Sequence, residues 1–67
     1  MKVYKPVFTD HWIIEELETD DLRRLGKDMI VSKAGTIYND NFYTTRDGAQ
    51  KYINWDYTGE RYYIPEG

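Results

Sequence analysis

His11, next to Asp10, has the most versatile acid–base side chain in this sequence. It is the only histidine, and the chain contains no cysteine. A transition-metal site usually needs two or more imidazole or thiolate ligands, and a serine or threonine nucleophile needs a base such as this single histidine. Ser32, the only serine, lies in a predicted strand with no activating base beside it. We therefore predict that His11 is a turn or surface residue, neither catalytic nor a metal ligand.

Carboxylates offer the next possibility, because five of them lie in the seven residues from Glu15 to Asp21. Such a run is typical of a solvated face or of the start of a helix. The segment Asn39-Asp40-Asn41 also supplies oxygen atoms, but it lacks the spacing of a twelve-residue calcium loop and its terminal glutamate. The five glycines are spread singly, which argues against a glycine-rich phosphate loop. The sequence therefore predicts a non-enzymatic protein without a metal or a cofactor.

Basic and aromatic residues interleave in the second half of the chain. The same pattern occurs in proteins that bind single-stranded nucleic acid by stacking its bases on aromatic rings. The residues concerned are Arg46, Lys51, Arg61, Tyr43, Tyr52, Tyr62 and Tyr63. Over residues 28–67, however, six acidic side chains outnumber four basic ones. The whole chain has a net charge of -3 and a pI near 4.9, so its field repels phosphate backbones and anionic membranes. Nucleic-acid binding through exposed tyrosines is therefore an alternative function and not the preferred one.

Protein binding agrees better with the composition. Two Trp, seven Tyr and two Phe make 16% of the chain aromatic, which is more than so small a core can bury. Tyr, Trp and Arg are also the residues most enriched at interface hot spots. We therefore predict a protein partner that contacts exposed tyrosines and the carboxylate run. The predicted partner-binding residues are Glu15, Glu16, Glu18, Asp20, Asp21, Tyr43, Tyr57 and Tyr63.

The charge suggests what kind of partner this is. A surface of carboxylates and tyrosines has the charge sign of a nucleic-acid backbone, which suits docking into the basic cleft of a DNA- or RNA-handling enzyme. In size and acidity the chain resembles the small inhibitor or accessory proteins of phages and mobile elements, a resemblance of composition that involves no motif. Two simpler hypotheses stay open. In the first, the acids serve only solubility. In the second, the chain is a structural subunit that forms a homo-oligomer through edge strands and aromatic faces.

Length and hydropathy bound the rest. With 67 residues the sequence predicts a single small globular domain, whose core alone gives a thin margin of stability. No apolar run reaches the roughly 18 residues of a membrane-spanning helix. The start Met-Lys-Val-Tyr-Lys-Pro lacks the apolar region of a signal peptide, and cysteine is absent. These features lead us to expect a cytoplasmic protein.

A hairpin followed by a helix is predicted between residues 28 and 55. Met29-Ile30-Val31 and Thr36-Ile37-Tyr38 favour two strands joined by a tight turn at Ala34-Gly35. Phe42-Tyr43 is predicted to pair back onto them as a third short strand. A helix over residues 45–55 follows, with Thr44 or Thr45 as its N-cap and apolar residues at helical spacing.

The flanking segments supply the remaining elements. Lys2 to Phe8 alternates as a strand, which Pro6 places at a sheet edge or at the strand's end. Residues 11–17 fit a strand or a helix equally well. Thr19 as N-cap and Gly26 as C′ residue predict a short helix over residues 19–25. Residues 60–64 predict a last strand that ends at Pro65.

Together these elements predict an α+β domain, with a small antiparallel sheet of three to four short strands, the 45–55 helix packed across it and the shorter 19–25 helix as a second cover. Trp12 and Trp55 are expected at the margins of the core. The predicted core residues are Val3, Val7, Ile14, Leu17, Leu22, Leu25, Ile30, Ile37, Ala49, Ile53 and Ile64.

Overall fold

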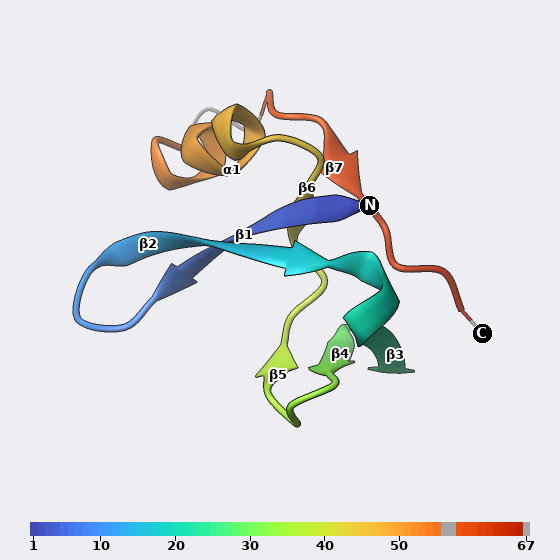
Figure 1. The fold of residues 1–67 in the computed structure, drawn as a ribbon. Coiled ribbons are helices and arrows are strands. Elements are labelled where there is room, and N and C mark those ends of the chain that lie inside the picture. The colour runs from blue at the N-terminus through green and yellow to red at the C-terminus, as the bar shows by residue number, and fades with distance from the viewer. Residues whose placement is uncertain (56–57, 67) are drawn as a thin grey trace.

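The computed structural model describes residues 1–55 and 58–66, and this part of the chain forms two antiparallel sheets, one α-helix and a turn of 3-10 helix. The elements are β1 (Lys2–Phe8), β2 (Trp12–Glu18), η1 (Thr19–Asp21), β3 (Leu22–Gly26), β4 (Met29–Ser32), β5 (Ile37–Tyr38), β6 (Phe42–Tyr43), α1 (Arg46–Ile53) and β7 (Arg61–Tyr62). The first sheet has the order β2-β1-β6-β7 and the second the order β3-β4-β5. Helix α1 lies on one side of the first sheet and the second sheet lies on the other (Figure 1). The α+β class is confirmed, with two sheets in place of one.

Strand β1 contacts both layers, because successive side chains of a strand point to opposite faces. Val3 is fully buried and joins the cluster between the two sheets, which also contains Leu22, Ile30, Phe42 and Ile64. On the other face, the Arg46 guanidinium of α1 lies over the Tyr4 ring at 5.5 Å. The first sheet is therefore the middle layer of three.

The β1–β2 hairpin explains why Pro6 is tolerated in an inner strand, where an edge strand was predicted. Two backbone hydrogen bonds show which residue pairs of the hairpin are hydrogen-bonded. They run from Thr19 N to Met1 O (2.9 Å) and from Thr9 N to His11 O (3.1 Å). In this register the odd-numbered residues of β1 exchange hydrogen bonds with β2, and Pro6 occupies a non-hydrogen-bonded pair. Its missing N–H would point away from β2, toward the side where β6 pairs with β1 only at Tyr4.

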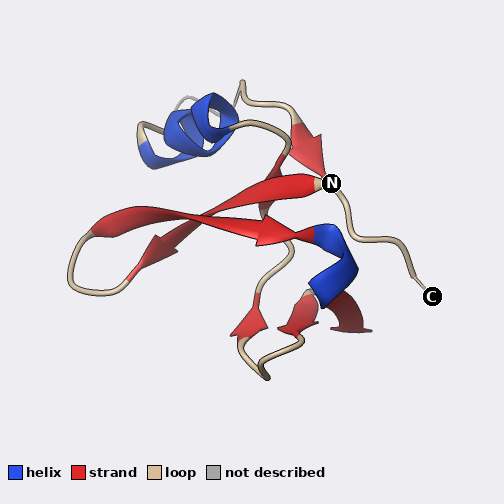
Figure 2. Ribbon diagram, in the orientation of Figure 1, coloured by secondary structure: helices blue, strands red, loops and turns tan. Residues whose placement is uncertain are grey.

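For residues 11–17 strand and helix were both open, and residues 12–17 form most of β2. The predicted helix over residues 19–25 is wrong. Only Thr19–Asp21 turns, as the short helix η1 (blue in Figure 2) that leads from β2 into β3. Residues 22–26 alternate between inward and outward positions and pair with β4, so Leu22 is buried while Leu25 is 55% exposed. A six-residue helix has few internal hydrogen bonds, and this segment gains more from the β4 ladder and the core.

The predicted hairpin over residues 28–38 is confirmed, with Ile30 opposite Tyr38 and Gly35 at a φ of 93° in the turn. Strand β6, however, does not pair back onto this hairpin. Tyr43 pairs with Tyr4 of β1 and Phe42 pairs with Tyr62 of β7. Strand β6 joins the first sheet and not the second because its two rings pack in different places. Phe42 lies between the sheets and Tyr43 lies beneath α1.

Helix α1 begins as predicted, with the Thr45 side chain accepting a hydrogen bond from Gly48 N at 3.0 Å. Gly48 lowers the intrinsic stability of the helix, but a Cβ atom at this position would approach Tyr43 to 3.3 Å. A Cβ atom on Gly59 would lie 2.5 Å from the Gly48 carbonyl oxygen. The two glycines therefore let the start of the helix pack closely against β6 and against the segment that precedes β7.

The predicted core is largely confirmed. Val3, Leu22, Ile30, Ala49 and Ile64 are buried, and Val7, Ile14, Leu17 and Ile53 are partly buried. Leu25 and Ile37 were wrong, since both are exposed. Phe42 and Tyr43 were missed, although they are among the largest fully buried side chains. No helix in the described ranges is long and apolar enough to cross a membrane.

Candidate functional site

Four aromatic rings form an unbroken chain at one end of the molecule. The Phe8 and Trp12 rings lie 5.3 Å apart, Trp12 and Tyr52 lie 5.9 Å apart, and Tyr52 stacks with Trp55 at 6.4 Å. We call these four residues the aromatic end. Phe8, Trp12 and Trp55 are all exposed. The patch therefore offers contiguous ring surface to solvent, the kind of surface that usually marks an interaction site.

Two elements build this patch. The β1–β2 hairpin sets Phe8 directly opposite Trp12, and the last turn of α1 brings Tyr52 against Trp12. The helix then ends with Asn54 N donating to Gln50 O and Trp55 N donating to Tyr52 O. Trp55 follows at a φ of 63°, a left-handed conformation that favours glycine and is rare for a bulky residue. Because the residue is 69% exposed, the requirements of core packing do not account for a tryptophan there.

A depression of about 300 Å³ adjoins the aromatic end. Phe8, Trp12 and Tyr52 form part of its wall, and it is completed by Lys5, Pro6, Val7, Ile37, Tyr38 and Asn39. This volume is at the lower limit of small-ligand pockets and suits a single inserted side chain.

Lys5 is the unusual polar group of that depression, since only 5% of the residue is exposed. Its Nζ lies 5.7 Å from the centre of the Phe42 ring and makes one long hydrogen bond, 3.5 Å, to the Pro6 carbonyl. Burial lowers the pKa of Lys5 to about 8, because the attraction of Asp40 and Glu15 only partly offsets the lost hydration and Arg61 adds repulsion. The prediction from sequence did not identify Lys5. The feature that could have identified it is a charged residue on the same face as Val3 and Val7 in an alternating strand.

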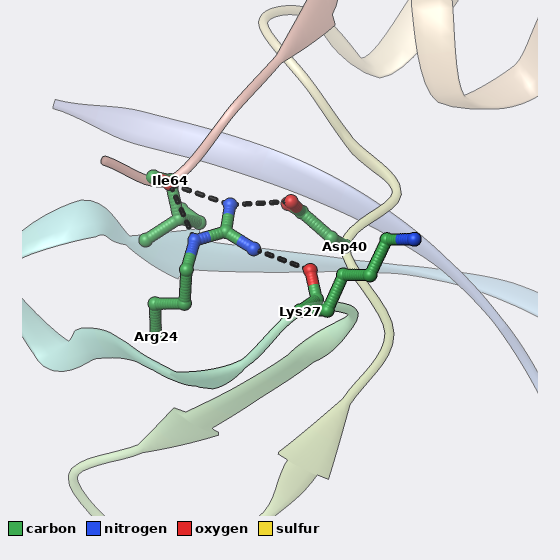
Figure 3. Close-up of polar contacts among 4 residues, drawn as sticks. All are labelled: Arg24, Lys27, Asp40 and Ile64. Carbon is green, nitrogen blue, oxygen red and sulfur yellow. Dashed lines mark hydrogen bonds and ion pairs between the residues drawn. The ribbon is translucent and has the colours of Figure 1, made fainter. Parts of the chain in front are cut away.

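A second charge that is largely shielded from solvent, Arg24, connects distant segments (Figure 3). Its Nε and Nη2 donate to the Ile64 carbonyl at 3.0 and 2.6 Å, and its Nη1 donates to the Lys27 carbonyl at 2.8 Å. Nη2 also donates to the Asp40 carboxylate, and both side chains are little exposed, at 13% and 12%. This cluster joins the β3–β4 turn, the β5–β6 loop and the segment after β7, and we assign it a structural role.

The carboxylate run is divided by the strand geometry. Glu15 accepts a hydrogen bond from the Tyr38 hydroxyl at 2.8 Å, between the layers. Glu16 pairs with Lys2 at 3.3 Å and Glu18 pairs with the N-terminal amine at 3.6 Å, on the opposite face of β2. Asp20 and Asp21 are exposed in the 3-10 turn. The five predicted acidic residues therefore do not share one face.

The predicted tyrosine contacts fare differently. Tyr43 is wrong as a partner-binding residue, because it is only 2% exposed and lies beneath α1, where its ring contacts Tyr52. Tyr63 is 63% exposed, with the Arg61 guanidinium 6.0 Å from its ring. Tyr57 lies outside the described residues. Among the described residues the exposed aromatic side chains are Phe8, Trp12, Trp55 and Tyr63, so Tyr63 is the one tyrosine of this group.

His11 lies in the exposed turn between β1 and β2, as predicted. Its Nδ1 lies 2.7 Å from the Asp10 carboxylate, and hydrogen bonds from Thr9 and His11 lower the pKa of that carboxyl. Within residues 1–55 and 58–66, no three His, Asp or Glu side chains are grouped to hold a metal ion.

Comparison with known proteins adds no relative to this description. No family model matches the chain, and neither a curated protein nor a solved structure is significantly similar to it. The function is therefore inferred from the geometry of the chain itself.

Proposed function

We propose that this chain is a non-catalytic protein-binding module and that the aromatic end is the surface it presents to its partner. The observation that carries the proposal is the unbroken chain of four rings, three of them exposed, within 67 residues of sequence. Tryptophan and tyrosine supply large contact areas at low entropic cost and dominate interface hot spots. Trp55 supports the proposal further, since it keeps a bulky side chain where the backbone favours glycine.

The charges near the patch define the chemistry of the partner. The exposed Asp10 carboxylate lies in the turn between Phe8 and Trp12, and the negative end of the α1 dipole lies at Tyr52 and Trp55. Indole faces also bind guanidinium and ammonium groups through cation–π interactions. We therefore expect a partner surface that combines apolar side chains with arginine or lysine, one apolar side chain entering the adjoining depression.

A basic cleft of this kind is typical of enzymes that handle DNA or RNA. The specific form of the proposal is that the chain inhibits or regulates such an enzyme. Its net charge of -3 and the exposed acids Glu16, Glu18, Asp20 and Asp21 support this form, since they favour encounter with a basic surface.

Affinity capture with matched variants tests the proposal. Trp55→Ala and Phe8→Ala each remove one exposed ring of the aromatic end, whereas Leu25→Ala removes an exposed apolar side chain of β3 as a control. We expect wild type and Leu25→Ala to bind the same discrete partner. We expect both aromatic variants to bind it at least about 30-fold more weakly, which corresponds to a hot spot of about 2 kcal/mol.

Thermal unfolding of each variant serves as the control for folding. Because Trp55 and Phe8 are mostly exposed, both variants should remain folded at the assay temperature. Undiminished binding by folded Trp55→Ala and Phe8→Ala would refute the proposal.

A further inference from the structure

Strand β2 is the one long, regular edge strand in the described part of the chain, residues 1–55 and 58–66. It has seven residues, all paired in register with β1. The other edge strands are protected in the ways that natural proteins use. Strands β5 and β7 have two residues each, and the pairing of β3 is irregular between Arg24 and Gly26. Among the strands of the described residues, only β2 therefore offers an extended template for a further strand.

The alternation of hydrogen-bonded and non-hydrogen-bonded pairs between β1 and β2 identifies which backbone groups of β2 can pair with a further strand. Ile13, Glu15 and Leu17 direct their N–H and C=O groups toward β1, because they occupy the hydrogen-bonded pairs fixed by Thr19 and His11. The alternate residues of β2 direct theirs away from β1, where the sheet order of the described chain places no strand. These residues are Trp12, Ile14, Glu16 and Glu18.

The same four residues share one face of the sheet, the face that α1 covers at Trp12. Along β2 this face changes from aromatic to aliphatic and then to two carboxylates. Glu16 pairs with Lys2 and Glu18 pairs with the N-terminal amine, in exposed contacts of 3.3 and 3.6 Å. Exposed ion pairs of this kind are weak, so both carboxylates are able to accept further cations.

We propose that β2 accepts an extended basic segment of the partner protein, which adds to the first sheet as a further antiparallel strand. This proposal rests on the protein-binding function proposed above and specifies the segment that is bound. In the bound segment, the residues opposite Trp12 and Ile14 are apolar, and those opposite Glu16 and Glu18 are lysine or arginine. Main-chain hydrogen bonds supply affinity, and the alternating side chains supply specificity.

A second copy of this chain suits the edge less well. Antiparallel pairing of β2 with itself over its full length would place Glu15 opposite its own copy. It would also set Glu16 opposite Ile14 and Glu18 opposite Trp12. Like charges directly opposite one another destabilise a sheet, and the apolar residues would face carboxylates. A basic partner segment meets neither penalty.

A synthetic peptide tests the proposal without the natural partner. The probe is acetyl-Lys-Thr-Lys-Thr-Val-Thr-Val-amide, which sets its lysines opposite Glu18 and Glu16 when it runs antiparallel to β2. Hydrogen exchange by NMR is measured with and without excess peptide. We expect exchange of the Trp12, Ile14, Glu16 and Glu18 amides to slow at least about tenfold, because these N–H groups become paired. The alternate amides of β2 should change little, and a peptide with glutamates in place of lysines should have no effect.

Proline and N-methyl groups then test the backbone contact. Glu16→Pro removes an outward N–H that Glu16→Ala retains, and Pro6 shows that this hairpin accepts proline at a non-hydrogen-bonded position. We expect Glu16→Pro to bind the peptide at least about tenfold more weakly than Glu16→Ala. If Glu16→Pro does not fold, the same comparison is made on the peptide. N-methylation of the second lysine and first valine should block binding, and N-methylation of the last two threonines should not.

Uniform protection of all β2 amides, equal binding of the glutamate peptide, or equal binding of the two N-methylated peptides would overturn the proposal. Trp55→Ala separates this result from the function proposed above. Trp55 is not part of β2, so this variant should bind the peptide like wild type while losing the natural partner. Peptide binding that fails while Trp55→Ala still abolishes partner capture would refute strand addition alone.

Discussion

Arg24→Ala is expected to lower the free energy of unfolding by about 3 kcal/mol, the lower end of the usual loss for a buried ion pair, because this pair is only partly buried. The variant loses four hydrogen bonds, two to Ile64 and one each to Lys27 and Asp40. It also leaves the Asp40 carboxylate, which is only 12% exposed, without the cation that hydrogen-bonds to it. A chain of this size has a total stability of roughly 3 to 10 kcal/mol, so a large unfolded fraction is expected. Urea denaturation followed by circular dichroism measures the difference.

Two further variants show whether the ion pair is the cause. Arg23→Ala removes the exposed neighbouring arginine of β3 and should change the free energy of unfolding by less than about 0.5 kcal/mol. Arg24→Met combined with Asp40→Leu removes both charges and should recover much of the lost stability. Equal losses in Arg24→Ala and Arg23→Ala would contradict the structural role assigned to the cluster.

Lys5 gives the second large effect, which depends on pH. Its pKa is about 8 in the folded chain and 10.5 in the unfolded chain. Between these values the folded chain has released the proton that the unfolded chain still binds, so stability rises with pH. The expected rise is about 3 kcal/mol from below pH 8 to pH 10.5. Above pH 10 the gain is opposed by Tyr38, whose pKa is raised by burial and by Glu15.

Lys5→Met isolates the lysine from the other groups that titrate in this range. The variant keeps an unbranched side chain and removes the buried charge, so it should be more stable than wild type at pH 7 by about 1 to 3 kcal/mol. The rise above pH 8 should disappear in Lys5→Met and persist in Lys33→Met, a control at an exposed lysine. A Lys5→Met variant that retains the full rise would contradict the burial of this amine.

Local signals in the sequence predicted the elements that local interactions stabilise. Thr45 caps α1, and the β4–β5 hairpin turns at Gly35, because caps and turns depend on neighbouring residues. The segment over residues 19–25 carried equally good local signals for a helix. Pairing with β4 overrode them, because it buries Leu22 and positions Arg24. The division into two sheets likewise depends on partners distant in sequence.

The candidate site shows the same limit. The sequence indicated surplus aromatic surface and placed Trp12 and Trp55 at the margins, and both are exposed. It did not show which rings meet, since Phe8, Trp12 and Trp55 come together only when α1 docks beside the hairpin. The prediction that Tyr43 is exposed was wrong for the same reason. Tyr43 is buried because α1 covers β6.

The most direct test of the proposed binding surface is site-specific photocrosslinking. A benzophenone amino acid replaces Trp55 in one sample and Leu25, an exposed control position on β3, in the other. We predict one discrete crosslinked partner from position 55, none from position 25, and loss of the crosslink when unlabelled wild type competes. Crosslinks of equal yield from both positions, or only from position 25, would contradict the assignment of the aromatic end as the partner-binding surface.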